Sequence, residues 1–163
     1  MRTLLIIVHS LTGGTWQMAE AAARGAAQEA GTRTRLLAAV DTHPADVLAA
    51  DGYLFATPEN LAAIAGLMKD FFDRCYYPAL GQLNGRPYAS LICAGTDGTN
   101  ATRQIARIAT GWRLRAVAEP LIILTGAQTP EAILAPKTIP PEALSRCEEA
   151  GAALAAGLAM GIF

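Results

Sequence analysis

The sequence predicts an α/β protein in which a parallel sheet lies between two layers of helices. Short, continuous apolar runs alternate with longer, alanine-rich segments that favour helix, and fully buried parallel strands have that continuous apolar pattern. Polar, glycine-containing loops follow several of these runs directly. A chain of 163 residues suits one domain with a sizeable core. We therefore expect a single doubly wound domain over residues 1–163.

Each apolar run of strand length is interpreted as one strand of a five-stranded sheet. In chain order the expected strands are Thr3–His9, Thr34–Ala38, Gly52–Ala56, Tyr88–Ala94 and Ala118–Leu124. Turn residues support the fourth strand: Asn84 and Gly85, with Pro87, end the element before it, and Gly95–Gly98 forms a loop directly after it.

Helices are expected between the strands. Their ranges are Thr15–Ala30, Leu61–Cys75, Asn100–Trp112 and Pro141–Leu158, with a short helix at Pro44–Ala50. In Leu61–Cys75 the apolar residues recur at helical spacing, which indicates a face that packs on the core. Four prolines between residues 125 and 142 exclude a long helix there. We expect an ordered surface excursion with one short helical turn that Thr129 and Pro130 begin.

Composition and charge exclude several classes of function. Hydrophobic residues make up 52% of the chain and charged residues 17%, which is too apolar for a disordered chain, while the apolar runs are too short for a membrane span. The run Leu4–Val8 lacks the features of a secretory signal. Thirteen basic and fourteen acidic residues, with no basic run, argue against nucleic acid as a partner.

The three cysteines, Cys75, Cys93 and Cys147, are far apart and contain no C-x-x-C pair. We interpret them as reduced structural residues of a cytoplasmic protein; a reactive thiol or a metal ligand is the alternative. His9 and His43 have no second ligand at suitable spacing, so no metal site is expected.

The loop after the first strand is the first candidate site. It runs through Ser10, Leu11, Thr12, Gly13, Gly14 and Thr15, and a helix-forming segment beginning at Trp16 follows. Such a strand-to-helix turn leaves backbone N–H groups converging at the positive end of a helix, which favours an anion. The alternative is that these residues only form a turn and cap the helix.

The loop lacks the parts that dinucleotide and triphosphate sites need. No lysine follows the glycines, and no G-x-G-x-x-G occurs. Because the loop contains no cation, we expect it to bind a phosphate monoester through neutral donors.

The pattern Ser10-x-Thr12-Gly13-x-Thr15 resembles the S/T-x-T-G-x-T phosphate loop of flavodoxins and flavin reductases. The order and lengths of the elements also resemble those of flavodoxin-like NAD(P)H-dependent FMN reductases. The resemblance implies a three-layer flavodoxin-like fold with strand order 2-1-3-4-5. It also implies one bound FMN, with NADPH or NADH as electron donor.

Two further loops should meet the first at the carboxyl edge of the sheet. After the third strand come Thr57, Pro58, Glu59, Asn60 and Leu61, which resemble the Pro-Glu-Tyr-Asn stretch of FMN reductases without its tyrosine. The resemblance implies that backbone amides there meet the flavin ring; a simple proline turn is the alternative.

After the fourth strand come Gly95, Thr96, Asp97 and Gly98, which the resemblance places at the pyrimidine side of the ring. Asp97 can accept from the ring N–H or cap the next helix. Aromatic residues that could cover the ring are Trp16, Tyr53, Tyr76, Tyr77 and Trp112, and Trp16 could flank the ribityl chain.

These observations favour an oxidoreductase in which FMN passes electrons from NAD(P)H to a flavin, a quinone or another small-molecule acceptor, without a protein acid or base as catalytic residue. A flavodoxin-type electron carrier is the alternative, although such carriers tend to be strongly acidic and this chain has a net charge of −1. A binding module that has lost flavin is a third candidate.

The apolar composition predicts a closed homo-oligomer, a homodimer or homotetramer. Its expected interface consists of Tyr76, Tyr77 and Pro78 together with the proline-rich excursion.

Overall fold

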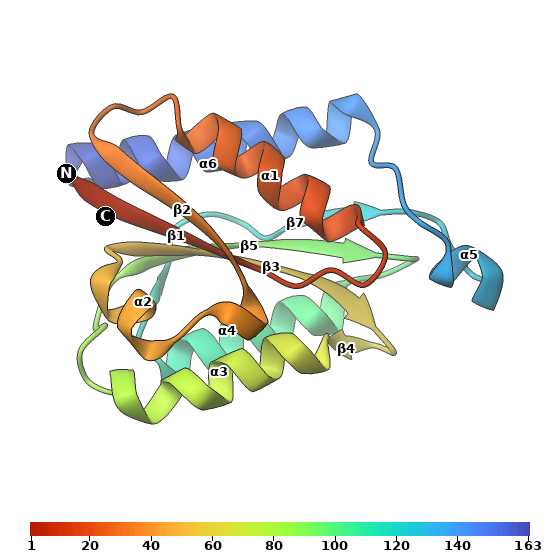
Figure 1. Ribbon diagram of the computed structural model, residues 1–163, viewed down its shortest axis with the longest axis horizontal. Helices are drawn as coiled ribbons and strands as arrows, with labels where there is room; N and C mark the ends of the chain where they lie inside the picture. The colour runs from red at the N-terminus through yellow and green to blue at the C-terminus, as the bar shows by residue number, and fades with distance from the viewer.

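A computed structural model describes residues 1–163 as a three-layer α/β domain (Figure 1). The strands are β1 (Arg2–Val8), β2 (Thr32–Ala38), β3 (Gly52–Asn60), β4 (Ala63–Ile64), β5 (Pro87–Ala94), β6 (Arg115–Ala116) and β7 (Leu121–Leu124). The helices are α1 (Gly14–Ala26), α2 (Pro44–Ala49), α3 (Gly66–Ala79), α4 (Thr99–Gly111), α5 (Pro130–Leu134) and α6 (Pro141–Met160), with a 3-10 turn at Ala39–Asp41. No helix combines the length and the apolar character that a membrane crossing requires.

The central sheet is parallel, in the order β2-β1-β3-β5-β6, and β7 pairs with β5 beyond β6. The expected order of five strands is therefore confirmed. The expected fifth strand, Ala118–Leu124, is shorter: β7 begins at Leu121, directly after Pro120, which has no N–H for the ladder. The separate strand β6 pairs with the start of β5.

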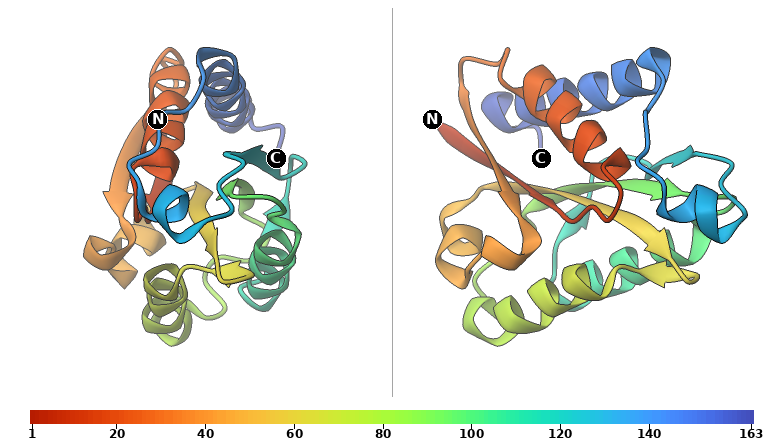
Figure 2. Two further views of the ribbon diagram at one scale, coloured as in Figure 1. Left: turned by 90° about the vertical axis from the view of Figure 1, so that its right-hand side faces the viewer. Right: turned by 45° about the vertical axis from the view of Figure 1, so that its right-hand side comes forward.

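Helices cover both faces of the sheet, and each face has its own core. α1 and α6 lie on one side and α2, α3 and α4 on the other (Figures 1 and 2). The α3 side holds an aromatic cluster in which Phe55 contacts Phe72 and Trp112. The α1 side is built from small and aliphatic side chains. This dense packing fixes the strand ends that carry the loops.

The segment after Ala56 differs from the expected loop. β3 continues to Asn60 and turns back into β4, so that the expected helix from Leu61 begins only at Gly66. Three side-chain bonds hold this hairpin. Gln104 accepts from the Ile64 N–H at 2.8 Å, the Thr57 hydroxyl accepts from the Ala65 N–H at 3.3 Å, and the Asn100 amide donates to the Ala62 carbonyl at 2.6 Å. These long-range contacts override the local helix preference of the leucine and alanines.

The hairpin turn has an unusual backbone. Leu61 and Ala62 have φ values of 49° and 62°, both in the left-handed region. A two-residue turn of this kind matches the twist of the strands but normally uses Asn-Gly. Leu61 is fully exposed, at 101%, so burial of its side chain does not offset the strain.

Two glycines set the distance between α1 and α6. A Cβ on Gly25 would collide with the carbonyl oxygen of Glu148, and a Cβ on Gly151 would collide with that of Ala22. The helices therefore cross with their backbones in contact. This crossing positions the N-terminus of α1, where the first candidate loop lies.

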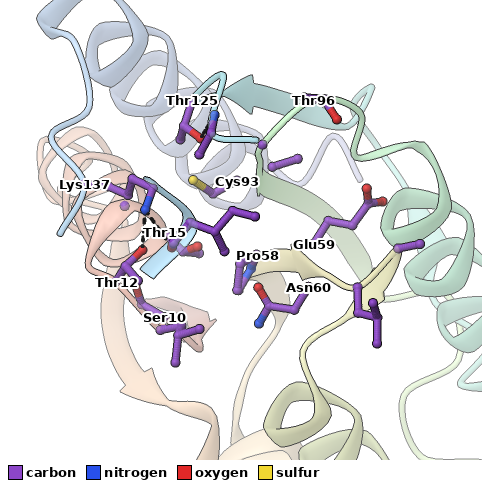
Figure 3. Close-up of a pocket in the computed structure, with 18 residues that line it drawn as sticks. Ser10, Thr12, Thr15, Pro58, Glu59, Asn60, Cys93, Thr96, Thr125 and Lys137 are labelled. Atoms are coloured by element: carbon purple, nitrogen blue, oxygen red, sulfur yellow. Dashed lines mark hydrogen bonds between the residues drawn. The ribbon is translucent and has the colours of Figure 1, made fainter. Parts of the chain in front are cut away.

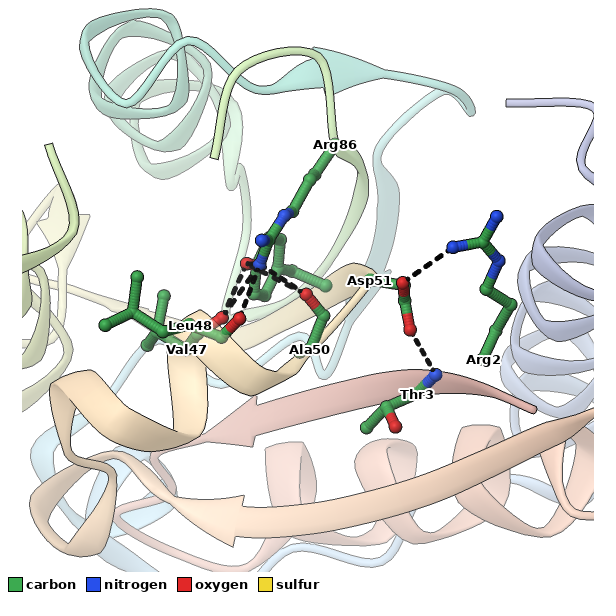
Figure 4. Close-up of polar contacts among 8 residues, drawn as sticks. Arg2, Thr3, Val47, Leu48, Ala50, Asp51 and Arg86 are labelled. Carbon is green, nitrogen blue, oxygen red and sulfur yellow. Dashed lines mark hydrogen bonds and ion pairs between the residues drawn. The ribbon is translucent and has the colours of Figure 1, made fainter. Parts of the chain in front are cut away.

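The opposite, amino edge of the sheet is held by structural polar contacts (Figure 4). The Arg86 guanidinium donates to the carbonyls of Leu48 (2.9 Å) and Ala50 (2.5 Å), at the C-terminal end of α2. Asp51 accepts from Arg2 and from the Thr3 N–H. These contacts provide hydrogen-bond partners for backbone groups at the ends of α2 and β1. All of them lie away from the carboxyl edge of the sheet.

Candidate functional site

A cavity of about 360 Å³ lies at the carboxyl edge of the sheet (Figure 3). Its wall comes from the carboxyl ends of β3 and β5 and from the segments that follow β1, β3, β5 and β7, as expected for a doubly wound sheet. The lining residues are Ser10, Leu11, Thr12, Gly14, Thr15, Pro58, Glu59, Asn60, Leu61, Ala62, Cys93, Ala94, Gly95, Thr96, Thr125, Ala127, Ile133 and Lys137. The volume is within the range of small-molecule sites.

The first loop presents unpaired donors to this cavity. Gly13, with φ 93°, makes the turn into α1, and its own N–H donates to the Ser10 hydroxyl at 3.0 Å. The N–H groups of Thr12, Gly14 and Thr15 have no acceptor within the protein. Together with the positive end of the 13-residue α1 they form an anion site.

A cation that the sequence pattern did not reveal completes this end of the cavity. Lys137 belongs to the proline-rich excursion, residues 125–140, which we call the strap. Its ammonium Nζ lies 3.4 Å from the Thr12 hydroxyl oxygen, and Figure 3 marks this contact with a dashed line. The loop itself is neutral, as expected, and the positive charge at its end of the cavity comes from the strap.

Glu59 fixes the second loop against the third. One carboxylate oxygen accepts the Gly98 N–H at 2.9 Å, and the other accepts the Ala101 N–H at 3.0 Å. Glu59 therefore caps α4, whose N-cap residue Gly98 has no side chain for that purpose. Pro58, Asn60 and Leu61 line the cavity beside it.

Four of the expected site residues do not line the cavity. Gly13 and Gly98 are the N-cap residues of α1 and α4, each with φ 93°. Trp16 points its indole N–H to Glu20 at 2.9 Å. Asp97 accepts from Thr99, and these hydrogen bonds lower the pKa of the Asp97 carboxyl.

The other aromatic candidates also lie elsewhere. Tyr53 and Trp112 belong to the α3-side core, and Tyr76 and Tyr77 lie at the far end of α3. None of these four lines the cavity.

Sequence reasoning missed seven of the lining residues: Ala62, Cys93, Ala94, Thr125, Ala127, Ile133 and Lys137. Most could have been found by extending the carboxyl-edge rule to the strand ends themselves and to the segment after the last strand. Lys137 has no local signal, although it is one of only two lysines in the chain. Burial raises the pKa of the Cys93 thiol, while the Thr15 hydroxyl and the Lys137 charge lower it in part.

An open, doubly wound sheet with an anion-binding loop after its first strand, at the switch point beside the third, defines a flavodoxin-like domain. The chain belongs to the NADPH-dependent FMN reductase family, whose model matches residues 38–128. That match contains the second and third loops.

The curated relatives include a protein named as a flavodoxin and a protein named as a quinone dehydrogenase. The chain is 36% identical to a flavodoxin of Aquifex aeolicus, over 60% of this chain and 53% of the relative. It is 33% identical to an NAD(P)H dehydrogenase (quinone) of Acidithiobacillus ferrooxidans, over 45% of this chain and 47% of the relative. The chain thus spans about half the length of the curated relatives it matches.

Solved structures share the fold at low sequence identity. An archaeal flavodoxin aligns with a TM-score of 0.74 at 18% identity, over 97% of this chain and 99% of that one. The flavodoxin, WrbA-like protein from Agrobacterium tumefaciens aligns with a TM-score of 0.72 at 19% identity, over 99% of both chains.

Proposed function

We propose that the chain binds one FMN in this cavity and passes electrons from NADPH or NADH to a flavin, a quinone or another small acceptor. The observation that carries the proposal is the set of unpaired N–H donors in Thr12, Gly14 and Thr15 at the start of α1. These donors suit a phosphate group, and the family name supports FMN as its carrier. When bound, FMN supplies hydride and electron-transfer chemistry.

The protein's own residues have positioning roles in this proposal. The backbone of residues 10–15 and the hydroxyls of Ser10, Thr12 and Thr15 hold the phosphate. The segments 58–61 and 95–96 lie at the other end of the cavity, where they would border the ring. Glu59 keeps these two segments in register through its bonds to Gly98 and Ala101.

A flavodoxin-type electron carrier is the second candidate, and the Aquifex relative's name favours it. The net charge of −1 favours the enzyme, because strongly acidic surfaces are the usual means of steering a carrier to basic partners. Oxidation of NADPH by the FMN-loaded protein under air, followed by absorbance, distinguishes the two candidates. Turnover supports the enzyme, and its absence in an FMN-loaded protein supports the carrier.

The binding step is tested by titrating the full chain with FMN and with riboflavin, which lacks the phosphate. FMN should bind much more tightly. Thr12→Val should weaken FMN binding by about 1–3 kcal/mol, the value of a hydrogen bond to a charged group. The affinity for riboflavin should not change. Thr110→Val, in an exposed turn of α4, is the matched control. Equal affinities for the two flavins would refute the proposed phosphate site.

A further inference from the structure

The strap is fixed against the first loop by its backbone. The Lys137 N–H donates to the Thr12 carbonyl at 2.9 Å. Gln17, in the first turn of α1, donates to the Lys137 carbonyl at 2.7 Å and accepts from the Ile139 N–H at 3.0 Å. Because Ile139 is also buried, at 3% exposure, residue 137 has a defined position beside the anion site.

Gly14 allows this close approach. A Cβ on Gly14 would lie 3.3 Å from the Lys137 Cβ and 3.0 Å from the Cys93 sulfur, which is tighter than ordinary van der Waals contact. The missing side chain lets the strap pack directly on the loop whose N–H groups face the cavity. The stem of Lys137 is therefore held where the proposed phosphate would bind.

The Lys137 ammonium has no counter-ion. Its acceptors are neutral: the Thr12 hydroxyl (3.4 Å) and the carbonyls of Ile133 (2.9 Å) and Ala135 (2.6 Å). It forms no ion pair, whereas the other lysine of the chain, Lys69, pairs with Asp73 at 2.7 Å. A half-buried cation at the edge of a cavity lined by unpaired N–H donors is suited to bind an anion.

We infer that Lys137 supplies the positive charge that binds the phosphate monoester of the flavin nucleotide, and that it makes the site select a phosphorylated ligand over its uncharged parent. The inference rests on the proposed function and adds to it a residue from outside the first loop. Lys137 exchanges its weak contact with the Thr12 hydroxyl for a phosphate oxygen, and the Thr12 hydroxyl, which only accepts in that contact, donates its own proton to the same group.

The test compares Lys137→Met and Lys137→Arg with the parent, using FMN and riboflavin as probes. Lys137→Met should weaken FMN binding roughly tenfold to a hundredfold, as expected for losing a charge-assisted bond, and should change riboflavin binding less than about twofold. Lys137→Arg should retain most of the FMN affinity because its charge is kept. Lys69→Met, which removes the same charge from α3, is the control and should leave both affinities unchanged.

Ionic strength gives a second readout. FMN affinity of the parent should fall as salt is added, because salt screens partly exposed charges, and the slope should be smaller in Lys137→Met. Equal slopes would contradict a direct charge interaction.

Because the substitution also removes the bonds to the carbonyls of Ile133 and Ala135, a measurement on the unmodified protein is needed. Acetylation by an N-hydroxysuccinimide ester, read by peptide mass, reports on both lysines at once. FMN and inorganic phosphate should protect Lys137, riboflavin should protect it much less, and Lys69 should react equally in all samples.

The outcomes separate this inference from the proposed function. If the parent binds no FMN, the proposed function fails. Two outcomes would contradict the role of Lys137 and leave the proposed function intact. In the first, the parent binds FMN, and Lys137→Met keeps both the FMN affinity and the preference for FMN over riboflavin. In the second, FMN binds but does not change the acetylation of Lys137.

Discussion

The carboxylate of Glu59, near the end of β3, accepts the backbone N–H of Gly98 at 2.9 Å. The two residues are 39 positions apart, yet this bond and the one to Ala101 cap α4 and join two walls of the cavity. Glu59→Ala should lower the free energy of unfolding by about 1–2 kcal/mol, the cost of losing a helix cap. Urea denaturation measures this change. Glu59→Gln, which keeps one acceptor oxygen, should cost less than Glu59→Ala.

Glu59→Ala should also weaken the binding of FMN and the binding of riboflavin by the same factor, because the loops that Glu59 joins lie away from the phosphate end of the cavity. That pattern is the opposite of the one expected for Lys137→Met. Loss of FMN alone would show that Glu59 acts at the phosphate instead.

The left-handed turn at Leu61 and Ala62 should be improvable. A non-glycine residue in this region costs about 1–2 kcal/mol, and Asn-Gly is the preferred pair. Leu61→Asn combined with Ala62→Gly should raise the free energy of unfolding by about 1 kcal/mol, part of the gain being offset by the flexibility of glycine in the unfolded chain. Leu61→Ser removes the exposed leucine side chain but leaves the backbone strain at Ala62, so it should raise the free energy of unfolding by less than the double substitution. A less stable double variant would mean that the turn differs from the one described.

Asp46 makes stability depend on acid pH. Burial raises the pKa of its carboxyl, but the His43 N–H bond and the hydrogen bond and charge of Arg35 lower it more, so the pKa lies below the ordinary 3.8. A carboxyl with a depressed folded-state pKa stabilises above its unfolded pKa and loses that contribution as pH falls through the folded value. Asp46→Asn should cost about 1 kcal/mol at pH 7, and the difference from the parent should shrink below pH 3.8. Asp73→Asn, in an exposed pair, should show little effect at either pH.

The thiols of Cys75 and Cys147 should be unreactive in the folded protein. Burial raises the pKa of the Cys75 thiol and of the Cys147 thiol to about 11, and the thiolate is the reactive form. A thiol-reactive disulfide at pH 8 should modify Cys93 first, because only Cys93 lines the cavity. All three should react after unfolding. Bound FMN should slow modification of Cys93 and leave the others unchanged; rapid labelling of Cys75 or Cys147 would contradict their burial.

The expected homo-oligomer stays a prediction. Large apolar side chains are exposed at the end of α3 and on α5, including Tyr77 at 78% and Leu134 at 67%. Light scattering at micromolar concentration should give the mass of a closed homodimer or homotetramer, and Tyr77→Ser with Leu134→Ser should shift it toward the monomer. A monomeric mass for the parent refutes the prediction.

The strands and the first loop could be predicted because their signals are local, whereas the order of the strands came from the family resemblance. Buried parallel strands are continuous apolar runs, and Ser10–Thr15 carries its glycines and hydroxyls within six positions. The hairpin could not be predicted, because Leu61, Ala62 and Ala63 favour helix on their own. The side chains of Thr57, Asn100 and Gln104, which bond residues 62 to 65, hold this segment as a hairpin.

Roles that depend on distant partners were also beyond the sequence. The sequence places Glu59 at the carboxyl edge of the sheet, but its cap on α4 depends on the spacing between β3 and β5. Lys137 lies 125 positions from Thr12, and nothing in the Pro-Lys-Thr context indicates a neighbour in the first loop.

The bonds between Gln17 and the strap also bear on the order in which the protein acquires its parts during synthesis. Gln17 lies near the beginning of the chain, and its partners lie 120 and 122 positions later. A nascent chain that has completed β1, α1 and β3 carries the first loop but not the residues that clamp it. Contacts between segments so far apart close late, so the phosphate end of the cavity takes its final form only when most of the chain has left the ribosome. In the proposed function, FMN then binds after the strap has folded onto the first loop.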